Sequence, residues 1–215
     1  DRTLTASTVN FVDTLAGGAN GLIITGNLDL DGAATNLSTL SVSTTSNLGA
    51  DVTTSSTQTY TGNATISDNI TLTTTNSNVT FGGTTNAGTA GNTLTIAAGT
   101  GDVTFTGAVG GTTAMGNTTI TTGALSAAAI KVQGTIDITN SDTSTITGII
   151  SDGATSAILT KAGSGTLTLS GNNTYTGQTN INAGIISITH NNALGSTNGA
   201  TIVADGASVS ISNDI

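Results

Sequence analysis

The chain has no cysteine, no proline and no tryptophan, and only 2% of its residues are aromatic. The lack of cysteine excludes disulfides and thiol chemistry. The lack of proline leaves every residue with a backbone N–H, which strands paired on both sides require. Charged residues amount to 7%, where an average domain has about 25%. Because stacked strands bring like side chains together, this scarcity of charge also favours a stacked sheet.

The few charges are mostly negative. The twelve acidic residues are all Asp, and three Lys or Arg leave a net charge of −9. Asp suits turns and Glu suits helices, so this usage agrees with an all-β fold. The negative charge argues against nucleic acid and anionic membrane surfaces as partners. No apolar run approaches the ~18–20 residues that span a bilayer, and residues 1–5 are not a signal peptide. We therefore expect a processed or excised piece of a longer chain, with no membrane insertion of this segment.

Ser, Thr, Asn and 29 Gly fill much of the remainder, a composition that can also indicate disorder. Disorder requires low hydrophobicity or high net charge, whereas 35% of this chain is hydrophobic and arranged in alternating pairs. Thr, Ser and Asn can form hydrogen-bonded ladders between stacked strands. The sequence therefore predicts a cross-β stack folded within one chain.

The most regular stretch runs from Ile158 to Ile188. Within it, residues 166–170 alternate small polar and apolar side chains, the period of a strand with one buried face. Glycines and asparagines bound this strand, and two more short strands follow at 179–182 and around Ile186. Three short strands without a two-residue hairpin loop predict a coil that advances rather than a hairpin that reverses.

This stretch resembles the autotransporter-associated β-strand repeat of bacterial surface and secreted passenger proteins. The matching positions are Leu159, Lys161, Gly163, Gly165, Leu167, Leu169, Gly171, Asn173, Tyr175, Gly177, Thr179 and Gly184. Gln178 stands where a second glycine is expected. The remainder resembles, more loosely, the β-solenoid repeats of large bacterial adhesins. The resemblance implies a place at the bacterial cell surface or outside the cell, but it implies no ligand.

Internal repetition supports a solenoid. Residues 59–62 recur at 174–177, and residues 78–81 resemble 102–105, a spacing near one solenoid turn. From this spacing we expect about nine or ten turns and a rod about 45 Å long. We therefore predict an all-β fold, a right-handed parallel β-helix in which residues 1–215 form one continuous, elongated domain. The handedness follows from the resemblance and from the crossover preference.

Three segments are less regular. Residues 1–15 read as irregular apart from a possible strand at 9–12. Residues 44–57 form either a polar rung or a mobile loop. Residues 124–132 are rich in helix formers, but the strand-like flanks leave little room, so we expect strand or loop there.

The chain offers little for catalysis. Its one histidine, His190, lies beside a turn, where we expect it to be solvated, and no nucleophile-elbow motif accompanies it. We expect Lys161 on the surface at a strand edge, and Arg2 and Lys131 are isolated. Asp29 and Asp31 precede a turn without a calcium-loop pattern. We therefore predict no catalytic, cofactor or metal site.

The aromatic residues suggest structure rather than binding. Tyr60 and Tyr175 could be platforms for sugars, but their repeated positions favour a structural role, and we expect Phe81 and Phe105 to stack in the core. The Asn-X-Ser/Thr pattern of glycosylation sequons occurs at Asn36, Asn63, Asn69, Asn78, Asn117 and Asn172.

Three functions fit this sequence. The first is a non-catalytic stalk or adhesion segment of a bacterial surface or secreted adhesin, with a host-surface or matrix ligand. The alternative is a self-associating fibre or sheath protein that contacts neighbouring repeats and further copies end to end. The third, a carbohydrate-active enzyme on a β-helix, needs clustered carboxylates or basic residues, which the sequence does not display.

Overall fold

Short alternating segments form the strands, as the sequence predicts. In β9 (Val79–Phe81) the two apolar residues are buried and the Thr between them is half-buried, and most other strands repeat this pattern. The computed structural model describes residues 1–212, and these contain 24 strands and no helix. The turns between strands are rich in Gly, Asn and Asp, which suit tight changes of direction.

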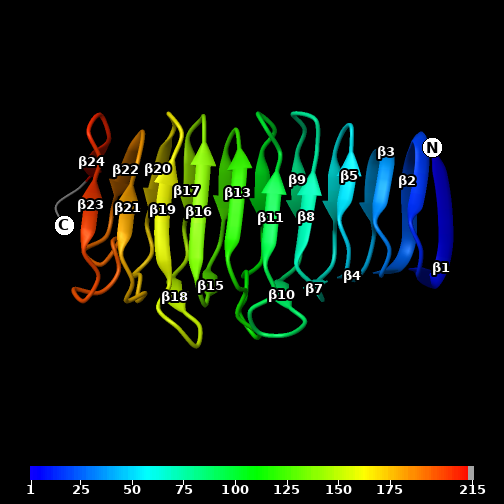
Figure 1. Cartoon of the computed structure of the whole chain (residues 1–215), viewed down its shortest axis with the longest axis horizontal. Coiled ribbons are helices and arrows are strands. Elements are labelled where there is room, and N and C mark those ends of the chain that lie inside the picture. The colour runs from blue at the N-terminus through cyan, green and yellow to red at the C-terminus, as the bar shows by residue number, and fades with distance from the viewer. Residues whose placement is uncertain (213–215) are drawn as a thin grey trace.

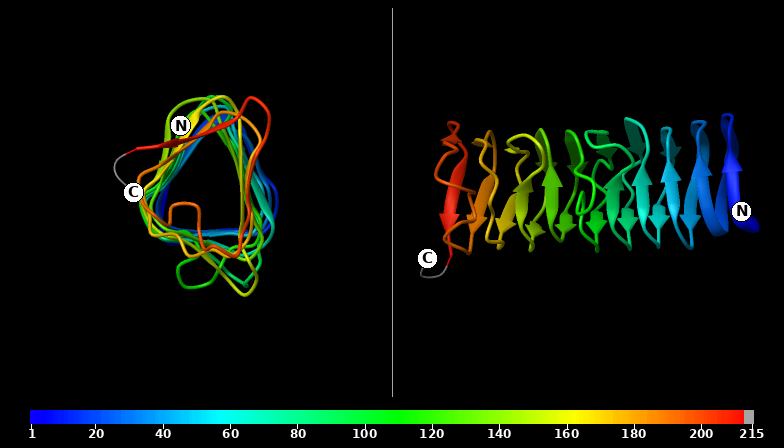
Figure 2. Two further views of the ribbon diagram at one scale, coloured as in Figure 1. Left: turned by 90° about the vertical axis from the view of Figure 1, so that its left-hand side faces the viewer. Right: turned by 90° about the horizontal axis from the view of Figure 1, so that it is seen from below.

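Successive coils stack in parallel and give a rod of triangular cross-section (Figures 1 and 2). Each coil passes through three faces, which we name C, A and B in chain order. Along face A ten successive pairings join eleven strands, so the rod has about ten coils. In Figure 1 the near strands run upwards while the chain advances from right to left, which makes the coil right-handed. The predicted fold class is therefore confirmed.

Face A is the longest ladder. Its strands are β1 (Arg2–Phe11), β2 (Leu15–Leu30), β3 (Ala34–Val42), β6 (Gln58–Tyr60), β9, β12 (Val103–Phe105), β14 (Leu125–Ala127), β17 (Ser144–Ile146), β20 (Thr166–Leu169), β22 (Ile185–Ile188) and β24 (Ser208–Ile211).

Faces B and C complete each coil, and the long strands β1, β2 and β3 continue around corners into them. Face B adds β4 (Ser46–Leu48), β7 (Ala64–Ile66), β10 (Thr85–Ala87), β15 (Ile130–Val132) and β18 (Ile150–Asp152). Face C adds β5 (Val52–Thr54), β8 (Ile70–Thr73), β11 (Leu94–Ala97), β13 (Thr118–Thr122), β16 (Thr135–Asn140), β19 (Ile158–Ala162), β21 (Thr179–Ile181) and β23 (Thr201–Val203).

An aromatic column occupies the core beneath face A. The rings of Tyr60 and Phe81 stack with centroids 4.9 Å apart, and those of Phe81 and Phe105 with centroids 5.0 Å apart. The same coils place small residues on face B, Ala64 after Tyr60 and Thr85 after Phe81, so large and small side chains share the interior. The predicted stacking of Phe81 on Phe105 is confirmed, and it extends to Tyr60.

Residues 59–62 and 174–177 do not occupy equivalent positions in the solenoid, so the prediction drawn from this longer-range repeat is wrong. Tyr60 lies on β6 in face A, whereas Tyr175 lies in the turn after β20, next to Thr174, whose N–H bonds to Ile150 O of face B. Likewise Ile66 lies on face B and Ile181 on face C. The similar segments lie one face apart because the corners between strands vary in length.

The three less regular segments are all built into the solenoid. Residues 2–11 form β1, so the possible strand at 9–12 is present as far as Phe11, and the expectation that the residues before it are irregular is wrong. Most of β1 is exposed. Residues 44–57 hold β4 and β5, with Ser46 and Thr54 buried, and are therefore a polar rung rather than a loop. Residues 124–132 form β14 and β15, as expected.

Candidate functional site

Asparagine side chains replace backbone carbonyls at the corners of the rod. Asn78 Oδ1 accepts the N–H of Asp102 at 2.9 Å, one coil further on, and Asn117 Oδ1 accepts that of Thr135 at 2.9 Å. Asn63 and Asn69 make the same bond to the next coil at 3.0 and 2.9 Å. Four of the six sequon asparagines therefore accept a backbone N–H of the next coil, which explains why Asn is frequent in the turns.

The other two sequon asparagines lie in different settings. Asn172 Oδ1 accepts a hydrogen bond from the Asn192 amide at 2.8 Å, and Asn36 is exposed with a positive φ of 52°. Asn tolerates this left-handed conformation better than most residues.

A row of buried polar side chains follows the corner between faces C and A. Gln58 donates to Thr73 O at 2.9 Å, Thr122 to Gly101 O at 2.8 Å, and Asn140 to Thr166 O at 3.1 Å. These groups satisfy carbonyls that the turning backbone directs into the interior. Their hydrogen bonds explain how polar residues are tolerated in the core, and sequence reasoning did not single them out.

Lys161 is the most unusual member of this corner, and the expectation that it lies on the surface is wrong. Its neighbours in the ladder are Ile138 and Ile181, so its side chain points into an aliphatic column and is fully buried. The ammonium donates to the carbonyls of Ala162 at 2.7 Å, Gly163 at 2.9 Å and Ala183 at 3.2 Å. Burial lowers the pKa of Lys161 to about 8. The alternation from buried Leu159 contained this signal, because residue 161 must share its face.

The two tyrosines are structural, as expected. Both are fully buried. Tyr60 donates to Gln58 Oε1 at 3.0 Å, and burial raises the pKa of this phenol. Tyr175 shares a hydrogen bond of 2.6 Å with the Thr179 hydroxyl, and burial raises its pKa to about 12. Neither ring is available as a platform for sugars.

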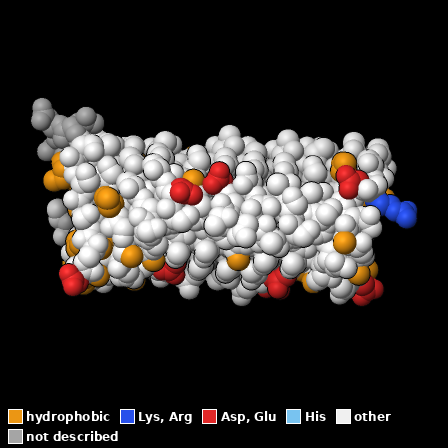
Figure 3. Space-filling view, turned by 90° about the horizontal axis from the view of Figure 1, so that it is seen from above, with side chains coloured by type: hydrophobic (Ala, Val, Ile, Leu, Met, Phe, Trp, Pro, Cys, Tyr) orange, Lys and Arg blue, Asp and Glu red, His pale blue; other side chains and the backbone are white. Residues whose placement is uncertain are grey.

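The remaining ionisable candidates do not converge. Asp29 accepts amide N–H groups from Asn10 at 2.9 Å and Asn47 at 2.7 Å, so it joins three coils, and Asp31 is exposed. The imidazole Nδ1 of His190 accepts the N–H of Asn192 at 3.0 Å and stabilises a turn. Among residues 1–212, no three His, Cys, Asp or Glu gather as metal ligands. Figure 3 shows scattered carboxylates on an otherwise mostly uncharged face.

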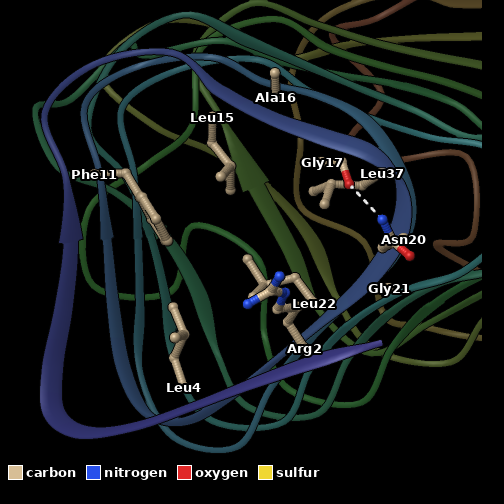
Figure 4. Close-up of a pocket in the computed structure, with 10 residues that line it drawn as sticks. All are labelled: Arg2, Leu4, Phe11, Leu15, Ala16, Gly17, Asn20, Gly21, Leu22 and Leu37. Atoms are coloured by element: carbon tan, nitrogen blue, oxygen red, sulfur yellow. Dashed lines mark hydrogen bonds between the residues drawn. The ribbon is translucent and has the colours of Figure 1, made fainter.

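A recess lies at the exposed beginning of the core. It measures about 330 Å³ and lies inside the first coils, where Leu4, Phe11, Leu15 and Leu22 point inward (Figure 4). Arg2 pairs with Leu22 in register and therefore occupies a core position at the rim. Because the lining consists of solenoid core positions, this recess is continuous with the core rather than a separate ligand site.

With the geometry established, comparison with known proteins identifies one stretch of the chain. Residues 159–188 match the passenger-associated-transport-repeat family. In the structure this repeat comprises β19 to β22 and contains Lys161, Asn173 and Tyr175, whose side chains are all buried. The resemblance to an autotransporter passenger repeat is therefore confirmed over these residues. No curated protein and no solved structure matches the chain. Within residues 1–212, no helix could cross a membrane.

Proposed function

We propose that the chain is a non-catalytic stalk or adhesion segment of a bacterial surface-exposed or secreted passenger protein. The observation that carries this proposal is the transport repeat at 159–188, set within a solenoid. The chemistry of the described residues agrees with it. The buried side chains of Lys161 and Gln58 bond to backbone carbonyls, and among residues 1–212 no three His, Cys, Asp or Glu gather as metal ligands. A rod of stacked coils would hold binding regions of the parent protein away from the cell.

The test uses cells that produce the parent protein and matched cells in which residues 1–215 are deleted in frame. We expect added protease to cleave this segment on intact cells, and the deletion to shorten the surface projection and reduce attachment. The proposal is contradicted if the segment is protected from protease until the cells are lysed and the deletion leaves attachment unchanged. A variant of the same length carrying substitutions only on exposed Thr residues controls for effects on export.

A second candidate, a fibre formed by association along the rod axis, is favoured by apolar side chains on the first and last coils. Leu4, Ile202 and Ile211 are exposed there. Electron microscopy of purified chain separates the two: regular filaments support the fibre, and single rods support the stalk.

A further inference from the structure

Two Asn-Gly pairs occur in the chain, at residues 20–21 and 198–199. An asparagine loses its side-chain amide most readily before glycine, because glycine has no Cβ to keep its nitrogen away from the Asn side chain. Asn20 and Asn198 are both exposed. The two pairs can therefore be compared by what surrounds the glycine nitrogen, which is the atom that reacts.

A carboxylate faces the glycine nitrogen of the first pair. Arg2 pairs with Leu22 in register, which places Asp1 opposite Gly21 on the neighbouring coil. The Gly21 N–H donates to Asp1 Oδ1 at 3.1 Å. A Cβ on residue 21 would lie 2.6 Å from this oxygen, so the absence of a side chain lets the carboxylate reach the nitrogen. This distance is within the reach of a general base.

The second pair has a peptide carbonyl in the same place. The Gly199 N–H donates to the carbonyl oxygen of Ser196 at 3.3 Å. A carbonyl oxygen accepts a hydrogen bond but is a far weaker base than an ionised carboxylate, so it does not take up the proton. Residues 198–199 are therefore an internal comparison for residues 20–21.

The side chain of Asn20 is held loosely. Its Nδ2 donates to the carbonyls of Gly17 at 3.3 Å and Gly18 at 3.1 Å, and Figure 4 shows the first of these bonds. Both bonds are exposed to water and contribute little net free energy, so the side chain can turn towards the Gly21 nitrogen at small cost. The same bonds brace a corner in which Ala19 has an unfavourable φ of 63°.

We infer that Asn20 is a site of self-catalysed deamidation, with Asp1 as the general base. The Asp1 carboxylate takes the proton of the Gly21 N–H, and this nitrogen forms a bond to Asn20 Cγ. The bond from Cγ to Nδ2 breaks, and Nδ2 leaves as ammonia with the proton passed on from Asp1. Water then opens the cyclic imide. Cleavage between the nitrogen and Cγ gives Asp, and cleavage at the main-chain carbonyl gives isoaspartate.

Either product weakens the first coils. A carboxylate at residue 20 cannot donate to the carbonyls of Gly17 and Gly18, and it repels these oxygens and Asp1, so the corner loses its brace. Isoaspartate also lengthens the main chain just before Leu22 and disturbs its pairing with β1. This chemistry belongs to the chain itself and does not depend on the proposed stalk role.

The first test follows both pairs in the folded 215-residue chain during incubation at neutral pH. Peptide mapping by mass spectrometry detects the exchange of NH₂ for OH, and chromatography separates Asp from isoaspartate. We expect Asn20 to convert about tenfold faster than Asn198 or more. In urea, which separates Asp1 from Gly21, the two should convert at similar rates. Faster conversion of Asn20 in urea than in the folded chain would mean that the hydrogen bond protects the site, and the inference would be wrong.

The second test removes the base but keeps the hydrogen bond. In Asp1→Asn the side-chain oxygen still accepts the Gly21 N–H, but a carboxamide does not take up the proton. We expect this variant to slow the conversion of Asn20 by about tenfold or more and to leave Asn198 unchanged. Asp13→Asn, which removes an exposed carboxylate just after β1, is the control for net charge and should behave like the parent. Equal rates at Asn20 in the parent and in Asp1→Asn would overturn the inference.

Discussion

At the scale of single residues, the rod is stabilised by side chains that complete the hydrogen bonds of the turns. Each corner turns some backbone groups away from the ladder, and a buried or half-buried N–H or C=O without a partner is costly. Asn78 and Asn117 supply acceptors to the next coil, and Lys161 supplies three donors to inward carbonyls. Lys161 is polar in the sequence but occupies a core position, whereas the two asparagines join coils from exposed corners.

We predict that Lys161→Met lowers the free energy of unfolding by about 1–3 kcal/mol at pH 7. Met fills the aliphatic column, but it leaves the carbonyls of Ala162, Gly163 and Ala183 without a donor. Lys131→Met, on the outward side of β15, is the matched control and should change stability by less than about 0.5 kcal/mol. Urea unfolding followed by circular dichroism measures both, and a Lys161→Met variant as stable as the parent would contradict the assignment.

The same lysine predicts a dependence on pH. Its pKa is about 8 in the folded chain and 10.5 in the unfolded chain, so the unfolded chain holds more protons between these values. The stability contribution of this group is therefore lost as the pH falls through 8, and the free energy of unfolding should rise from pH 8 to pH 10. Lys161→Met should abolish this rise. Above pH 10 the raised pKa values of the tyrosines act in the opposite direction.

At the scale of strands, the period of two in the sequence was sufficient to locate the elements of the most regular stretch, β20 to β22. Alternation in 166–170 and the offset of 24 between Phe81 and Phe105 gave the correct faces and register. The recurrence of residues 59–62 at 174–177 does not mark equivalent positions, because residues outside the strands add unequally to each coil. The charge of Lys161 predicts a surface position, but the alternation after Leu159 places residue 161 on the buried face of its strand.

The aromatic column supplies a prediction at this scale. Phe81→Ala removes the central ring between Tyr60 and Phe105 from a fully buried site, and we expect a loss of about 3–5 kcal/mol. Thr80→Ala, on the opposite side of the same strand, should cost less than about 1 kcal/mol. Denaturant unfolding monitored by circular dichroism compares them, and similar midpoints for the two variants would show that the column adds little.

At the scale of the whole molecule, each coil contacts only its neighbours, so stability is expected to be highest in the middle of the rod. The first and last coils are largely exposed, whereas β11, β13 and β16 have pairing on both sides.

Amide hydrogen exchange of the 215-residue chain should therefore be slowest in β11 to β16 and fastest in β1 and β23. Mass spectrometry of exchanged peptides measures this gradient along the axis. Uniform protection over all coils would mean that the rod opens only as a whole and would contradict nearest-neighbour stability.

The sequence by itself determined that the chain is all-β and that its coils advance in parallel, because alternation and turn chemistry are local properties. The passenger repeat followed from the resemblance of residues 158–188 to a known family, which the family match at 159–188 confirms. Only the tertiary structure decided which polar residues face inward and which side chains of different coils meet. Both depend on how many residues each corner contains, since one residue more or less moves every following side chain to a different place on the rod.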